Sequence, residues 1–193
     1  MFWLKRPSRN QISQFLDFHK DAPFSYSEVG NTAGDLPTGY RIDHNRQKLG
    51  RGAETYERAV AALKHWKQFD LGWVQIVPDE TPIEVGAVVG VLTRHFGFWS
   101  LNACRIVYLI DESGPVRKFG FAYGTLSDHV ERGEERFTIE HDLADGAVWY
   151  DILAFSQPSK LLVKLVLPVA RMLQKRFAED SKRRMLNSVA PVA

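Results

Sequence analysis

The sequence predicts an α+β domain in which an antiparallel sheet lies against a long C-terminal helix. Between residues 73 and 155, β-rich runs of about five to nine residues alternate with turn signals, which is typical of an antiparallel meander. From residue 156 to residue 187, apolar residues instead recur at helical spacing opposite a basic face. The chain has 193 residues, of which 45% are hydrophobic, so we expect one domain with one substantial core.

Residues 1–37 are expected to form a short helix and an irregular loop. Residues 11–20 place apolar side chains on one side of a helix, and the following stretch is rich in Gly, Pro, Ser, Thr, Asp and Asn. The sheet region, residues 38–155, begins with a strand over residues 40–49. A helix is inserted near residues 53–67, because apolar residues there form a stripe at helical spacing. The stripe consists of Tyr56, Ala59, Val60, Leu63 and Trp66.

Alternation of apolar and polar residues predicts the remaining strands. Phe137 and Ile139 point to one face of a strand, while Arg136, Thr138 and Glu140 point to the other, so one face is buried and one is solvated. The runs are WVQIV, VGAVVGVLT, ACRIVYLID, KFGFAYGT, ERFTIEHD and VWYDILAF. The glycines expected within strands, where they allow the sheet to bend, are Gly86, Gly90, Gly120 and Gly124.

The C-terminal helix, residues 156–187, is expected to cross the concave face of the sheet, with residues 188–193 as a tail. Ser156 is interpreted as its N-cap and Pro158 as a residue of its first turn. Pro168 removes a backbone donor inside the helix and predicts a kink. Lys175 is expected to be exposed. The residues expected to face the sheet are Leu162, Leu165, Val166, Val169, Leu173 and Phe177. If Leu173 is fully buried, its replacement by Ala should cost about 2–5 kcal/mol.

The predicted order is strand, helix, six antiparallel strands and a long helix. This order resembles the helix-grip fold of the START and birch-pollen-allergen (Bet v-like, SRPBCC-like) superfamily, in which a curved seven-stranded antiparallel sheet wraps around the final helix. The strings CRIVYLIDE, FGFAYGTLSDHVERGEERF and ILAFSQP resemble, more specifically, the uncharacterised bacterial and plant family called domain of unknown function 1990. The resemblance implies a cavity between sheet and helix, and it brings no established activity. Helix-grip proteins usually have two helices after the first strand, whereas this sequence indicates one.

Composition and charge narrow the class of function. A net charge of +2 with interspersed signs does not indicate a nucleic-acid partner. The single cysteine, Cys104, lies in an apolar run and is interpreted as a small buried hydrophobe, and it excludes an intrachain disulfide. The N-terminal residues lack the apolar run of a secretory signal, and the most apolar stretch has 13 residues and contains Lys164 and Arg171. We therefore expect a cytoplasmic protein without a transmembrane segment.

Sequence motifs for metal or nucleotide chemistry are absent. The six histidines lack the paired spacing of a metal site. A Gly-rich phosphate loop, a GxSxG elbow and a dinucleotide fingerprint are also missing. The sequence therefore indicates no metal and no cofactor, and it assigns no catalytic residue.

Glu135 is the most suggestive polar residue, because period-2 alternation places it on the face of Phe137. A buried carboxylate must be paired or have a raised pKa, so Glu135 is a polar anchor or general acid in the cavity, or else a rim residue or structural partner of Arg105. His129 is expected at the cavity mouth or in a solvated loop. The expected ligand-binding residues are Glu135, Arg105, Tyr108, Tyr123, Thr125, Phe137, Tyr150 and His129.

These observations support three hypotheses of function. The first is a protein that binds a hydrophobic or amphipathic, lipid-like small molecule in the cavity. The second is an enzyme of the cyclase, dehydratase or hydrolase type that uses the same cavity. The third is a non-catalytic interaction module, and the basic C-terminal helix also suggests a weak contact with anionic membranes. A large apolar cavity favours the first, converging polar groups with a shifted carboxyl pKa favour the second, and a filled core favours the third.

Overall fold

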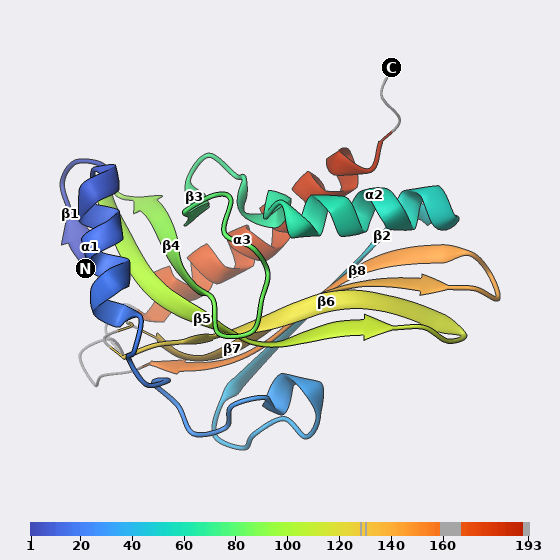
Figure 1. Ribbon diagram of the computed structural model, residues 1–193, viewed down its shortest axis with the longest axis horizontal. Helices are drawn as coiled ribbons and strands as arrows, with labels where there is room; N and C mark the ends of the chain where they lie inside the picture. The colour runs from blue at the N-terminus through green and yellow to red at the C-terminus, as the bar shows by residue number, and fades with distance from the viewer. Residues whose placement is uncertain (128, 130, 159–166, 191–193) are drawn as a thin grey trace.

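The computed structural model describes residues 1–127, 129, 131–158 and 167–190, and it has α2 and α3 on one face of a curved sheet (Figure 1). The helices are α1 (Arg9–His19), α2 (Ala53–Lys64) and α3 (Leu167–Ser188), with two short 3₁₀ helices, η1 (Asn31–Ala33) and η2 (Lys67–Phe69). The strands are β1 (Phe2–Trp3), β2 (Arg41–Arg51), β3 (Val74–Val77), β4 (Val88–His95), β5 (Phe98–Glu112), β6 (Val116–Thr125), β7 (Glu131–Asp142) and β8 (Ala147–Pro158).

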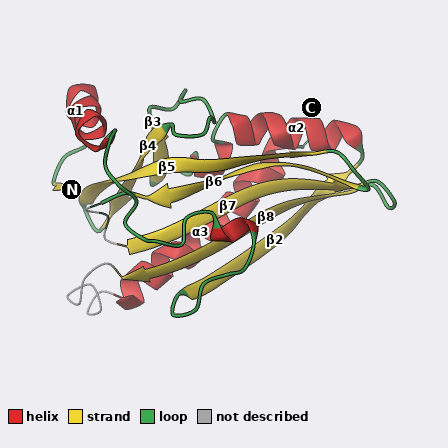
Figure 2. Ribbon diagram, turned by 60° about the horizontal axis from the view of Figure 1, so that its bottom comes forward, coloured by secondary structure: helices red, strands yellow, loops and turns green. Residues whose placement is uncertain are grey.

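The sheet is antiparallel, and within the described ranges it has eight strands. Seven of them follow the order β2-β8-β7-β6-β5-β4-β3, and β1 pairs with β5. Consecutive strands from β3 to β8 are neighbours, while β2 pairs with β8, so the segment from α2 to η2 must cross the sheet to reach β3. Figure 2 shows α2 and α3 on one face and the loop that contains η1 on the other. This arrangement confirms the predicted α+β helix-grip fold.

Large side chains on the concave face of the sheet fill the space beneath α2 and η2. Residues opposite one another on antiparallel strands share a face of the sheet, and Ile152, Phe137 and Phe121 form one such row. All three are buried, and the ring of Phe69 from η2 packs on Phe137 with 5.5 Å between centroids. Met185 of α3 is fully buried in the same core. The apolar core therefore joins the sheet, η2 and the C-terminal half of α3.

The loop between α1 and β2 covers the convex face and is held there by Glu134, which is 2% exposed. The hydroxyl of Tyr26 donates to this carboxylate at 2.8 Å, and the backbone N–H groups of Gly30 and Thr32 donate to it at 2.7 and 3.0 Å. The Thr32 hydroxyl also donates to it. A single buried carboxylate thus accepts hydrogen bonds from an irregular loop whose backbone N–H groups are not paired in a β-ladder.

Several predicted boundaries need correction. α2 ends at Lys64 rather than near residue 67, because Trp66 adopts a left-handed backbone conformation with φ of 54°. Trp66 is nevertheless buried, as its place in the predicted stripe requires. Gly86 lies in a turn with φ of +89° and not within β4, while the other three predicted strand glycines lie in strands. The short strand β1 was not predicted, and only α2 and the single turn of η2 lie between β2 and β3.

The predicted start of the C-terminal helix is wrong. Ser156 and Pro158 belong to β8, so neither caps a helix. β7 begins at Glu131, and its first residues pair with the end of β8, with Glu131 opposite Pro158 and Gly133 opposite Ser156. Ser156 also lies opposite Arg41 of β2. Ladder partners on both sides therefore hold this segment extended, which local capping preferences do not anticipate.

The buried side of α3 continues further along the helix than the sequence predicted. The predicted contacts Leu162, Leu165 and Val166 lie outside the described residues, as does the turn preceding Pro168 in which the kink was predicted. The side chain of Val169 is not described either. Leu173 is only partly buried, so the condition for a loss of about 2–5 kcal/mol on truncation to Ala is not met. Lys175 is exposed as predicted. Among the described side chains of the helix and its end, those of Ala178, Ser181, Met185 and Val189 are buried. In the described ranges, no helix combines the length and the apolar character needed to span a bilayer.

Candidate functional site

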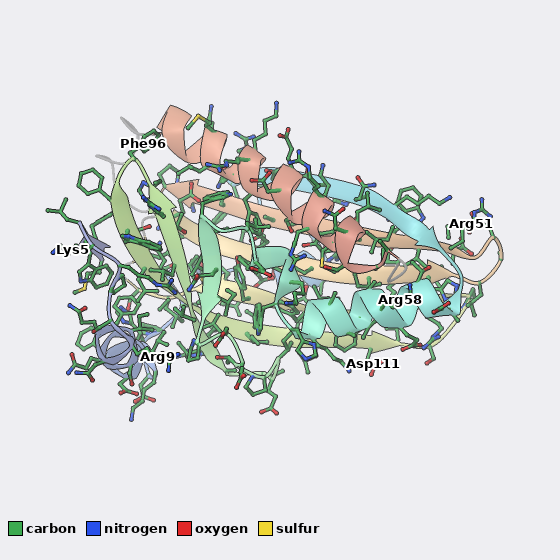
Figure 3. The ribbon with its side chains drawn as sticks, turned by 90° about the horizontal axis from the view of Figure 1, so that it is seen from above. Lys5, Arg9, Arg51, Arg58, Phe96 and Asp111 are labelled. Carbon is green, nitrogen blue, oxygen red and sulfur yellow. The ribbon has the colours of Figure 1, made fainter. Side chains whose placement is uncertain are left out.

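A cavity of about 840 Å³ lies between the concave face of the sheet and the part of α3 from Leu173 to Ala178. It is at the end of the molecule marked by Phe96, which lines it, and far from Arg51 at the opposite end (Figure 3). Most of its walls are apolar, and aromatic rings come from both the sheet and the covering segments. Its apolar lining includes Phe69, Trp73, Val91, Ile152, Leu173 and Phe177.

The cavity exists because the inward side chains at this end of the strands are small. Gly133 of β7 lies opposite Ser156 of β8, and its N–H donates to the Thr125 hydroxyl at 2.9 Å. Thr125 in turn lies opposite Cys104 of β5. The filled half of the sheet has aromatic rings at the corresponding positions. This row has only the small side chains of Ser156, Thr125 and Cys104, and Gly133 has none. The space above this row remains open for a ligand.

The next row carries the polar groups of the cavity. Asp43 lies opposite Ala154, Ala154 opposite Glu135, and Glu135 opposite Tyr123. Because opposed residues of antiparallel strands share a face, all four side chains point to the concave side. Two carboxylates are thus separated only by the methyl group of Ala154, beside a tyrosine hydroxyl.

Glu135 and Tyr123 form a hydrogen-bonded pair in the cavity wall. The Tyr123 hydroxyl donates to Oε2 of Glu135 at 2.7 Å. Burial raises the pKa of Glu135 to about 7, the Tyr123 hydrogen bond opposes this shift, and the nearby carboxylates of Asp43 and Glu131 add to it. Burial, followed by the charge of Glu135, raises the pKa of Tyr123 well above its usual value. Glu135 is therefore the member of the pair that changes charge near neutral pH.

Replacing Glu135 by Gln should remove a pH dependence of stability. Because burial raises its pKa from 4.5 to about 7, Glu135 holds its proton more tightly in the folded state. The free energy of unfolding should therefore fall as pH rises from 4.5 to about 7 in the wild type, relative to the variant. Urea denaturation of both proteins across this range checks the difference. A difference that does not change with pH would contradict the burial of this carboxyl group.

Gln174 and His129 are further polar residues that line the cavity near the start of β7. Gln174 of α3 donates to Oε2 of Glu131 at 2.8 Å and to the Ser156 hydroxyl at 3.3 Å, which ties α3 to the ends of β7 and β8. The backbone N–H of Glu131 donates to Nδ1 of His129 at 3.0 Å, so the His129 proton resides on Nε2. Burial lowers the pKa of His129 to about 4, and the ring is neutral at pH 7.

The family model described as "Domain of unknown function (DUF1990)" matches residues 25–184. The chain belongs to this family. The match spans the loop over the convex face, the whole meander and most of α3, and so includes every strand that lines the cavity except β1. DUF1990 membership thus confirms the family resemblance seen in the sequence.

Relatives of this DUF1990 chain match it over nearly its full length. A UPF0548 protein of Dictyostelium discoideum is 43% identical over 209 residues, covering 98% of this chain and 96% of the relative. A UPF0548 protein of Deinococcus radiodurans is 36% identical over 200 residues, covering 97% and 98%. Among solved structures, a START superfamily protein of Mycobacterium smegmatis is similar with a TM-score of 0.48 and 13% identity, covering 76% of this chain and 97% of that one.

Four of the predicted ligand-binding residues of this DUF1990 chain line the cavity, namely Glu135, Tyr123, Thr125 and His129. Phe137 and Tyr150 face the same side of the sheet but lie in the filled core. The Tyr150 hydroxyl is within 2.8 Å of the Ser181 hydroxyl of α3, so this residue fixes the helix. The predicted cluster thus divides between the cavity wall and the core that supports it.

Arg105 and Tyr108 were predicted in the cavity and lie on the convex face instead. Arg105 alternates with the buried Cys104 and donates to the backbone carbonyl of Lys20 at 2.7 Å, so it cannot pair with Glu135. Tyr108 would share a face with Ile106, but a β-bulge between them adds one residue and reverses its direction. The Tyr108 hydroxyl lies 2.7 Å from the Thr32 hydroxyl in the convex-face loop.

Sequence reasoning missed several polar residues of the cavity, among them Asp43, Glu131 and Gln174. Alternation along β2 would have revealed which face Asp43 occupies only after the partner strand was known, because β2 pairs with the distant β8. Glu131 and Gln174 meet through tertiary contact between β7 and α3. Among the residues that the structure describes, no group of three or more His, Cys, Asp or Glu could hold a metal ion.

Proposed function

We propose that this protein binds a hydrophobic or amphipathic small molecule in the cavity between its sheet and α3. The observation that supports this most directly is the cavity of about 840 Å³, which has predominantly apolar walls and the hydrogen-bonded pair of Glu135 and Tyr123. Ligand sites in proteins are typically concave, mostly apolar and about 300–1,000 Å³ in volume, with a few convergent polar groups. The cavity therefore has the size and the chemistry of a small-molecule site.

The walls supply affinity and the polar row supplies orientation. Burying an apolar ligand surface gains about 25 cal/mol per Å² removed from water, so rings such as Trp73 and Phe177 need no polar partner on the ligand. A polar group on the ligand would meet Glu135 and Tyr123, the hydrogen-bonded pair in the wall. An amphipathic molecule with one polar end satisfies both regions, whereas a fully polar molecule leaves the apolar walls uncompensated.

Filling the cavity from α3 should abolish ligand binding without unfolding the protein. Leu173 lines the cavity and is only partly buried, so Leu173→Trp places a large ring in the ligand space. A neutral naphthylamine dye should bind the wild type in the micromolar range and the variant at least tenfold more weakly. The dye is excited at a wavelength longer than those that tryptophan absorbs. Equilibrium titration of dye fluorescence measures both affinities.

Leu186→Trp is the matched control. Leu186 is on the same helix, is 39% exposed and is not among the lining residues, so the same substitution there leaves the cavity unchanged. We expect it to bind the dye like the wild type. If neither control nor wild type binds any neutral apolar dye, or if Leu173→Trp binds as well as both, the proposed site is wrong.

A second candidate function is an enzyme that uses Glu135 as a general acid or base. The raised pKa of Glu135, about 7 because of burial, suits proton transfer at neutral pH. The variant Glu135→Gln distinguishes catalysis from simple binding. If the protein is an enzyme of this kind, the variant should lose turnover of a substrate and still bind the neutral dye. The interaction-module hypothesis receives less support, because the space between sheet and helix is hollow.

Contact with anionic membranes through α3, and a cytoplasmic location, stay predictions. Several of the basic side chains of α3 are engaged in ion pairs: Arg176 lies 3.4 Å from Asp180, and Arg184 lies 2.6 Å from Asp70. These partners reduce the positive potential that the helix presents to a surface.

A further inference from the structure

The charged groups that face the cavity have one sign. Asp43, Glu131 and Glu135 all line it, from β2 and β7. Arg132, also in the lining, follows Glu131 directly on β7, and alternation directs its side chain to the convex side with Glu134. Two histidines, His95 and His129, also line the cavity. Burial lowers the pKa of both, that of His129 to about 4, which disfavours their charged forms. An apolar cavity of this size thus carries carboxyl groups and no opposing cation on its described walls.

The hydrogen-bond partners of these carboxyl groups are neutral. Asp43 accepts from the Asn45 side chain at 2.9 Å, Glu131 from Gln174 at 2.8 Å, and Glu135 from Tyr123 at 2.7 Å. Among the described residues, none of the three forms an ion pair, whereas carboxylates outside the cavity do. Glu140 lies 2.6 Å from Arg46 and Asp151 lies 3.3 Å from Arg136.

Two cations, Arg41 and Lys182, lie close to these carboxyl groups but are not among the residues that line the cavity. Arg41 lies opposite Ser156 and so shares the concave face. Lys182 of α3 donates to the Asn45 side chain at 3.3 Å, one row away from Asp43. The positive charge of Arg41 at the start of β2 acts on Glu131, but burial outweighs it and raises the pKa of that carboxyl. The other titratable groups that face Glu135 are Tyr123, Tyr150 and the Cys104 thiol, which carry no positive charge.

The row geometry leaves a position for one cation. Asp43 and Glu135 flank Ala154, two strand spacings or about 10 Å apart at their Cα atoms. Both side chains lie on the concave face, on either side of the small methyl group of Ala154, and all three residues line the cavity. A primary ammonium has three donors and no acceptor, so it can bond to carboxylates on two sides while its substituent points away from the sheet. The substituent then meets the aromatic and aliphatic walls toward α3.

We infer that the natural ligand of this cavity is an amphipathic amine, whose ammonium group lies between Asp43 and Glu135 and whose apolar body fills the space beneath α3. This inference rests on the proposed function, because it assigns a chemical class to the ligand of the same cavity. An anionic amphiphile such as a fatty acid would face like charges at short range in a poorly solvated site. A neutral amphiphile would gain the apolar contact but no charge-assisted hydrogen bond.

Three ligands with the same chain length and different charges distinguish the contribution of charge from that of apolar contact. Octylamine, octanol and octanoate should each be titrated against the bound neutral dye at pH 8. We expect octylamine to displace the dye at a concentration at least tenfold below that of octanol, and octanoate to be the weakest. The advantage of the amine over the alcohol should shrink from pH 8 to pH 6, since Glu135 takes up a proton with a pKa of about 7.

Variants assign the preference to the two carboxylates. Asp43→Asn and Glu135→Gln should each reduce the advantage of the amine at least threefold, while the affinity for octanol stays within twofold. Glu140→Gln, on the same strand but in an ion pair with Arg46 outside the cavity, should leave all three affinities unchanged. Equal displacement by amine and alcohol, or tighter binding of octanoate, would overturn the amine assignment and leave the apolar site intact. Absence of displacement by all three would overturn the proposed function as well.

Discussion

Replacing Met185 by Ala should lower the free energy of unfolding by about 2–5 kcal/mol, the usual cost of truncating a fully buried large side chain. Met185 is 0% exposed and belongs to the core that joins α3 to η2 and the sheet. Its removal loses transfer free energy and leaves a void, because the close-packed core to which it belongs cannot collapse freely. Urea denaturation followed by circular dichroism measures the change.

The adjacent residue supplies the control for this prediction. Leu186 is 39% exposed, so Leu186→Ala should cost less than about 1 kcal/mol, as is usual for surface positions. Leu173→Ala should fall between the two, since Leu173 is partly buried and already borders a cavity. Equal losses for Met185→Ala and Leu186→Ala would contradict the assigned buried face of α3.

Replacing Glu134 by Gln should destabilise the protein by about 2–4 kcal/mol, since a buried donor without an acceptor costs about 1–3 kcal/mol. Oε1 of this carboxylate accepts from both the N–H and the hydroxyl of Thr32, and Oε2 accepts from Tyr26 and the N–H of Gly30. An amide has only one oxygen, so its NH₂ group would face two donors, one of which is a backbone N–H that cannot act as an acceptor. The loop over the convex face should lose order before the sheet does.

Hydrogen exchange tests this directly. In Glu134→Gln, the amides of Gly30 and Thr32 should exchange faster than in the wild type, while amides in β6 and β8 should be unaffected. Glu140→Gln serves as control, because its ion pair with Arg46 is partly solvated and such pairs contribute at most about 1 kcal/mol. Unchanged exchange at both amides would show that the loop does not depend on the carboxylate.

The positions of Glu134 and Glu135 differ in how far the sequence predicts them. Adjacent residues on a strand point to opposite faces, so alternation alone correctly placed Glu135 with Phe137. By the same rule Glu134 must lie on the other face, but nothing in the sequence indicates that a loop about a hundred residues earlier buries it. Its four donors come from chain segments whose position depends on the completed sheet.

The sequence by itself determined the meander, the two amphipathic helices, the family and the inward direction of Glu135. These features rest on period-2 and period-3.6 patterns, which depend on neighbouring residues. Only the tertiary structure decided that Ser156 and Pro158 continue a strand, because Arg41 and Gly133 supply partners from distant parts of the chain. It also decided that Tyr108 leaves the cavity, since one bulged residue reverses the alternation of β5, and that Asp43 enters it. Pairing partners and bulges are non-local choices that minimise unpaired backbone groups over the whole sheet, so no single segment encodes them.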